Sequence, residues 1–116
     1  MTITLPLPVE SADACCGSVA DGAVDAQRAE GIARVFKALG DSTRVRLLSL
    51  IAASDSNEAC ICDLTEPVGL SQPTVSHHMK LLVDAGLATR EQRGRWAYYR
   101  VVDGALEAAA QSLLPR

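Results

Sequence analysis

Four cysteines are the residues of this sequence whose type and spacing could support specific chemistry. Cys60 and Cys62 are separated by one residue, and Cys15 and Cys16 are adjacent near the start of the chain. In a reducing compartment, cysteines serve more often as metal ligands or redox groups than as disulfides. Because soft thiolates select soft ions, these cysteines indicate As(III), Sb(III), Cd(II), Pb(II), Hg(II) or Zn(II).

The arrangement of Cys60 and Cys62 depends on where the next helix begins. On a helix the two side chains would point about 200° apart, whereas in an extended segment they share one side. A helix beginning at Asp63 would also favour thiolate over thiol nearby. Three alternatives stay open: Cys60 and Cys62 as small core residues, Cys15 and Cys16 as incidental residues of a loose arm, or a redox switch that forms a disulfide.

A thiol enzyme is not expected. Thiol phosphatase-like loops use Cys-x5-Arg, but the residues six positions after the cysteines are Asp21, Gly22, Glu66 and Val68. The sequence also contains no Cys-x-x-Cys. We therefore predict a protein that is not an enzyme and has no small-molecule substrate.

Residues 69–87 predict a DNA recognition helix. Ser71 is a suitable N-cap, Pro73 falls in the first turn, and Gly86 can close the helix in a left-handed conformation. An apolar stripe at helical period is formed by Val75, Met79, Leu82 and Val83. The other face is polar and free of acids in its first half, as contact with a major groove requires, and the candidate DNA contacts are Ser71, Gln72, Thr74, Ser76, His77 and Lys80.

The two histidines are adjacent, and neither is predicted to be a metal ligand. His77 projects with the outer, DNA-facing residues, whereas His78 borders the apolar stripe. We expect His78 to form a hydrogen bond within the domain.

Residues 87–102 predict two short strands joined by a tight turn. Aromatic residues favour the strands, and Gly94 supplies the positive φ that the turn needs. Arg93 and Arg95 flank the tip, where they could contact DNA phosphates. A helix followed by a basic β-hairpin is the arrangement of a winged helix-turn-helix.

The charge of the chain is unevenly distributed. The 116 residues carry a net charge of −3, but residues 71–100 carry +3 and the remainder −6. The local field at a contact surface, rather than the total charge, governs binding to DNA. No apolar run approaches a membrane span and no signal peptide is evident, so we expect a soluble cytoplasmic protein without a membrane partner.

The remaining chain predicts an α+β fold that is mainly α. We expect residues 1–24 to form a flexible arm with Cys15 and Cys16, and residues 25–116 to form one domain for DNA binding and dimerisation. Helices are predicted at residues 25–39, 43–53, 63–68 and 103–114. The first and last are too apolar for solvent, which predicts a homodimer through the terminal helices that binds a palindromic duplex.

Five segments together resemble the ArsR/SmtB family of metal-sensing bacterial repressors. They are residues 36–48 (FKALGDSTRVRLL), 60–64 (CICDL), 70–82 (LSQPTVSHHMKLL), 85–87 (AGL) and 93–99 (RGRWAYY). The resemblance extends from about residue 30 to residue 102 and implies a homodimeric winged-helix repressor that leaves its operator when a metal or metalloid ion binds. It also implies that Cys60 and Cys62 are ligands, as in sensors of arsenic, cadmium and lead.

The sequence departs from the arsenic-sensor pattern at one position. Some relatives have a third cysteine where this chain has Thr65. As(III) takes three thiolates, so Cys15 or Cys16, from the same or the other subunit, would complete an As(III) or Sb(III) site, whereas all four cysteines would suit Cd(II) or Pb(II). The zinc site that other members form on the C-terminal helix is expected to be absent, because Asp103 and Glu107 are present but no histidine is.

Overall fold

The computed structural model describes residues 22–115. Cys15 and Cys16, and the predicted arm at residues 1–24 except for its last three residues, lie outside this range. The described elements are α2 (Ala26–Ala38), α3 (Ser42–Ala52), the 3-10 turn η1 (Asp55–Asn57), β1 (Glu58–Cys60), α4 (Ile61–Val68), α5 (Gln72–Asp84), β2 (Ala88–Arg93), β3 (Trp96–Val101) and α6 (Ala105–Gln111).

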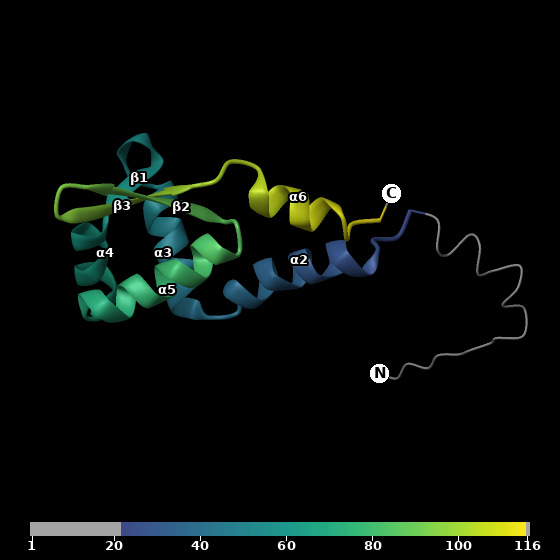
Figure 1. The fold of residues 1–116 in the computed structure, drawn as a ribbon, viewed down its shortest axis with the longest axis horizontal. Coiled ribbons are helices and arrows are strands. Elements are labelled where there is room, and N and C mark those ends of the chain that lie inside the picture. Colours follow the sequence, from purple (N-terminus) through teal and green to yellow (C-terminus); the bar gives the residue numbers. More distant parts are fainter. Residues whose placement is uncertain (1–21, 116) are drawn as a thin grey trace, which may run out of the picture.

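The described elements form a winged helix-turn-helix in which helices predominate, as predicted. The three strands make an antiparallel sheet with the order β1-β3-β2. The sheet packs against α3, α4 and α5, while α2 and α6 lie side by side and extend away from it (Figure 1). No helix among residues 22–115 has the length and hydropathy needed to cross a bilayer.

The core lies between the sheet and the three helices that it covers. Val75, Met79 and Leu82 of α5 are completely buried, which confirms the predicted apolar stripe. They contact a cluster whose largest fully buried members are Tyr99, Leu47, Ile51, Leu64 and Leu87. Burying each such side chain contributes about 1.5–3 kcal/mol, so this cluster fixes how α4 and α5 sit on the sheet.

Local capping explains most helix boundaries. Asp41 accepts hydrogen bonds from the backbone N–H groups of Thr43 and Arg44 and so begins α3. These two bonds, Arg44 first, hold the pKa of Asp41 below its usual value. Ser71 caps α5, and Gly86 has a φ of 85° after its last turn, both as predicted.

Two predicted helices have different bounds in the structure. α4 begins at Ile61 rather than at Asp63, because Cys60 acts as its N-cap. α6 is shorter than the predicted 103–114, because Gly104 precedes it in a left-handed conformation (φ 79°) and Ser112 ends it. The wing strands agree with the prediction, but the third strand, β1, was not predicted. Three residues are too few to show a strand pattern, and β1 forms only by pairing with β3.

Candidate functional site

Cys60 and Cys62 lie at the junction between the sheet and the helix-turn-helix. Cys60 is the last residue of β1 and pairs with Tyr98 of β3. Cys62 is the second residue of α4. Because the chain changes from extended to helical between them, the two side chains meet instead of diverging as they would on one helix.

The two sulfur atoms are in direct contact. The Cys62 thiol donates to Cys60 Sγ over 2.7 Å, and the Cys62 backbone N–H donates to the same sulfur over 3.4 Å. This separation exceeds the roughly 2.05 Å of a disulfide bond, and both cysteines are free. Cys60 is only 4% exposed, whereas Cys62 is exposed, so the pair is accessible from one side.

Protonation of the thiol pair differs from the sequence-based expectation. The hydrogen bond to Cys60 raises the pKa of Cys62 to about 11, with further contributions from desolvation and from the negative charges of Cys60 and Asp63. The expectation of a stabilised thiolate is therefore wrong for Cys62. The Cys62 thiol donates to Cys60 Sγ, and this hydrogen bond stabilises the neutral form of Cys62 by more than the helix N-terminus stabilises its thiolate.

The donor chemistry of the pair fits a thiophilic ion. Two adjacent thiols can contact one ion, since thiolate bonds are about 2.3 Å for Zn(II). Among residues 22–115, no group of three or more His, Cys, Asp or Glu side chains has an arrangement suited to a metal ion. The predicted additional ligands, Cys15 and Cys16, lie outside these residues. The Thr65 hydroxyl donates a hydrogen bond to the Cys62 carbonyl over 3.2 Å and so stabilises the backbone at Cys62.

The helix-turn-helix itself is formed by α4 and α5. Gly69 follows α4 with a φ of 71°, a conformation that favours glycine, and its N–H donates to the carbonyls of Thr65 and Glu66. Ser71 then caps α5 and donates to the Thr74 hydroxyl, 3.0 Å away. Among the predicted base-contacting residues, all are exposed except Ser76, which is half-buried; they are Ser71, Gln72, Thr74, Ser76 and His77.

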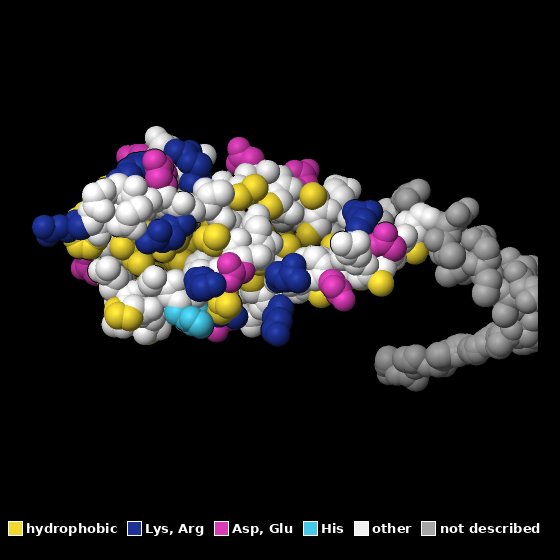
Figure 2. Space-filling model, in the orientation of Figure 1, with side chains coloured by type: hydrophobic (Ala, Val, Ile, Leu, Met, Phe, Trp, Pro, Cys, Tyr) yellow, Lys and Arg dark blue, Asp and Glu magenta, His cyan; other side chains and the backbone are white. Residues whose placement is uncertain are grey.

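The basic side chains at the predicted DNA surface differ in whether an acidic side chain forms an ion pair with them. Lys80 pairs with Asp84 over 2.9 Å in an exposed i, i+4 ion pair, which is weak and leaves the ammonium accessible. Arg95 at the wing tip is exposed and forms no ion pair with another described residue. Figure 2 shows Lys and Arg side chains at the end of the β2–β3 hairpin and along α2 and α5. His78 Nδ1 lies 3.0 Å from Arg44 Nη1, so its predicted bond within the domain is present.

Arg93 is placed differently from Arg95, and no local sequence signal indicates this difference. Its guanidinium forms ion pairs with Glu58 of β1 and Glu91 of β2 and lies 4.4 Å from the centre of the Tyr98 ring. Glu58 lies 35 positions earlier in the chain. Sequence reasoning missed it because β1 was not predicted.

The chain resembles bacterial regulators in sequence. Residues 41–90 match the model of the family described as bacterial regulatory protein, arsR family. A putative arsenical resistance operon repressor from Halobacterium salinarum is 41% identical over 91 residues, which cover 78% of this chain and 74% of the relative.

Solved structures show the same fold. An antimony-specific transcriptional repressor superposes with a TM-score of 0.62 at 30% identity, covering 83% of this chain and 86% of that one. A homodimeric winged helix-turn-helix DNA-binding domain from Mycobacterium bovis superposes with a TM-score of 0.61 at 21% identity, covering 92% and 85%. At that level of identity the second comparison supports the fold alone.

Proposed function

Because this chain belongs to the arsR family of bacterial regulatory proteins, we propose that it is a transcriptional repressor that leaves its operator when a thiophilic ion binds to Cys60 and Cys62. The proposed base contacts are Ser71, Gln72, Thr74, Ser76 and His77, and the proposed phosphate contacts are Lys80, Arg93 and Arg95. Gln can pair with an adenine edge, and the basic residues can meet phosphates.

The position of the thiol pair supports this proposal most directly. Cys60 caps the first helix of the helix-turn-helix, and only Gly69, Leu70 and Ser71 separate that helix from the recognition helix. A change at the start of α4 therefore acts on the element that positions α5. Ligand binding alters DNA affinity only if the ligand binds the DNA-free conformation more tightly, and this junction is where such a difference can arise.

The proposed inducers are As(III) and Sb(III), with Cys15 or Cys16 as the third ligand. The relatives named for arsenical resistance and antimony specificity support this choice. Cd(II), Pb(II) or Zn(II) are the alternatives, and a site formed by all four cysteines would suit Cd(II) or Pb(II). Soft thiolates can bind each of these ions. The number of cysteines that bind the ion therefore distinguishes an As(III) or Sb(III) site from a site for the alternative ions.

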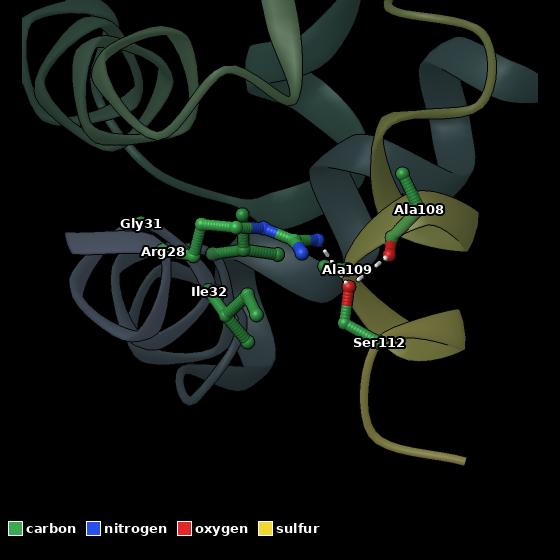
Figure 3. Close-up of a pocket in the computed structure, with 7 residues that line it drawn as sticks. Arg28, Gly31, Ile32, Ala108, Ala109 and Ser112 are labelled. Atoms are coloured by element: carbon green, nitrogen blue, oxygen red, sulfur yellow. Dashed lines mark hydrogen bonds between the residues drawn. The ribbon is translucent and has the colours of Figure 1, made fainter. Parts of the chain in front are cut away.

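A homodimer formed through α2 and α6 is also proposed. Large apolar side chains remain exposed on and next to these helices: Phe36, Val45, Leu106, Leu113 and Leu114 are 41–57% exposed. α2 and α6 contact each other in a shallow groove, where Arg28 donates to the Ser112 hydroxyl over 2.9 Å (Figure 3). A two-fold dimer would cover the apolar residues and present two recognition helices to a palindromic operator.

Titration of ions into the reduced protein on its own upstream DNA tests the proposed function. Fluorescence anisotropy of a labelled duplex should fall when As(III) or Sb(III) is added, and peroxide treatment without an ion should have no such effect. Release by peroxide alone would favour the thiol redox switch, and release by Cd(II) or Pb(II) alone would favour the four-cysteine site. A duplex that stays bound under every condition would contradict the proposal.

The affinity for Cd(II), Pb(II) or Zn(II) is expected to rise with pH. Because the pKa of Cys62 is about 11, its thiol is protonated near neutral pH and must release its proton to solvent when an aquated divalent cation binds, whereas a hydroxide of As(OH)3 takes up that proton and leaves as water. The apparent dissociation constant for a divalent cation should therefore fall about tenfold per pH unit for each proton displaced, and that for As(III) should change little. Competition against a chelator of known pH dependence at pH 6, 7 and 8 measures this slope. A slope near zero for Cd(II) would show that its binding displaces no thiol proton.

A further inference from the structure

One side of the sheet connects the thiol pair to the wing. Because successive side chains of a strand alternate, Glu58 and Cys60 project to the side opposite buried Ala59. Glu58 pairs with Arg100, and Cys60 pairs with Tyr98. Across the next strand pair, Tyr98 faces Glu91 and Trp96 faces Arg93, so all these residues lie on the same side.

Arg93 is bound on this side by three groups. Its Nη1 donates to Glu58 Oε1 over 3.2 Å, its Nη2 forms an ion pair with Glu58 Oε2, and the same Nη2 lies 2.8 Å from Glu91 Oε1. The guanidinium also stacks on Tyr98. Glu91 and then Glu58 raise the pKa of Arg93, which reflects stabilisation of its charge. The Glu91 side chain is 66% exposed and that of Glu58 only 18%, so solvent screens the Glu58 contact less.

Glu58 is itself held in place. Arg100 Nη2 lies 3.5 Å from Glu58 Oε2, and Arg100 Nη1 donates to the Ser56 carbonyl over 3.0 Å. Ser56 and Asn57, directly before β1, have φ values of 60° and 56°, a left-handed turn that brings the chain into the sheet. The carboxylate of Glu58 therefore occupies a position set by the backbone of β1 and by its pairing with β3.

We propose that Glu58 restrains DNA binding by holding Arg93 away from phosphate. The proposal rests on the proposed function, because it requires that the wing contacts DNA. Arg93 can bind a phosphate with its full hydrogen-bonding capacity only after it leaves Glu58. Glu58 is thus a positioning residue for Arg93, and because it shares a three-residue strand with Cys60, it joins the thiol pair to the wing.

Because Glu58 and a DNA phosphate would compete for Arg93, removing the Glu58 carboxylate should strengthen operator binding. Replacing Glu58 by Gln removes the bidentate partner of Arg93 and retains the shape of the side chain. Operator affinity should rise about threefold to fivefold at low salt, which corresponds to the removal of a partly exposed ion pair of roughly 0.6–1 kcal/mol. The salt dependence should steepen by about 0.9 for each arginine that gains a phosphate contact.

The experiment compares Glu58→Gln with Glu107→Gln, Arg93→Ala and the Glu58→Gln/Arg93→Ala double variant. Anisotropy of labelled operator DNA between 50 and 300 mM salt gives the affinity and slope for each, at concentrations of order the dissociation constant. Glu107→Gln, on α6, which lies away from the end of the β2–β3 hairpin (Figure 1), is the control for the loss of one negative charge. We expect the affinity gain for Glu58→Gln only, and its disappearance in the double variant.

Two results would overturn the proposal. One is a gain in Glu58→Gln no larger than that in Glu107→Gln, and the other is a gain that persists without Arg93. Ion titration of the DNA-free Glu58→Gln variant serves as a separate readout, because Glu58 is not a proposed ligand and ion affinity should stay within about twofold of the parent. If the parent protein binds neither the operator nor an ion, the proposed function fails rather than the role of Glu58.

Discussion

Serine at either Cys60 or Cys62 is expected to leave operator binding within about twofold of the parent and to abolish release by As(III) or Sb(III). Neither thiol lies among the proposed DNA contacts, so the ion-free variants should retain the DNA-binding surface. Each variant removes one of two adjacent sulfurs that lie 2.7 Å apart. Anisotropy of labelled operator DNA, with and without the ion, measures both properties in one experiment.

The expected loss of response is large. A coupling free energy of about 3 kcal/mol lowers operator affinity by roughly a hundredfold, and a variant that cannot bind the ion loses all of it. Because Cys60 is also the N-cap of α4, circular dichroism of Cys60→Ser should confirm that the fold is intact; serine is a good N-cap. Full ion response in either single variant would remove that cysteine from the ligand set.

The Cys15/Cys16 double serine variant tests the remaining ligands. If one of these thiols completes the site, the double variant should bind DNA as the parent does and lose its response to As(III). The two single variants then show whether either thiol suffices. Release of DNA by the double variant at the parent's ion concentration would show that the site does not include Cys15 or Cys16.

Alanine at both Arg93 and Arg95 is expected to weaken operator binding by about tenfold to a hundredfold at low salt. The loss should affect all duplex sequences alike, because phosphate contacts do not depend on the base sequence. Salt dependence should also become shallower. Arg95→Ala alone should account for the larger share, since Arg95 has no ion pair with another described residue whereas Arg93 is held by Glu58 and Glu91.

Gln72→Ala provides the contrast to the wing variant. Gln72 is exposed at the start of α5, where it can reach base edges. The loss of this side chain should reduce the difference in binding free energy between operator and unrelated DNA by about 1–3 kcal/mol, with little change in the salt dependence of binding. An unchanged salt slope in the double arginine variant would exclude the wing as a phosphate-binding element.

Local sequence signals were sufficient for most of the fold. The N-cap at Ser71, the glycine at position 86 and the apolar stripe of α5 each depend on neighbouring residues, and all are present in the structure. The hairpin was predictable for the same reason, because a turn with Gly94 joins two strands that pair with each other.

Long-range pairing explains what was missed. β1 is stabilised by a strand that lies about 40 residues later in the chain, so nothing in residues 58–60 identifies it. The same pairing brings Glu58 to Arg93 and turns a predicted free phosphate contact into an ion-paired side chain. The beginning of α4 was misplaced by two residues because the cap is a cysteine sulfur, which differs from the usual oxygen caps.

Trp96 is the first residue of β3 and pairs with Arg93 of β2. Its side chain is 37% exposed. It is the only tryptophan of the chain, so the intrinsic emission excited at the red edge of the protein absorption comes from the wing alone. The protein therefore contains an optical reporter at the tip of its hairpin. Its emission spectrum and its accessibility to a quencher can follow the environment of the wing on and off DNA without any attached dye.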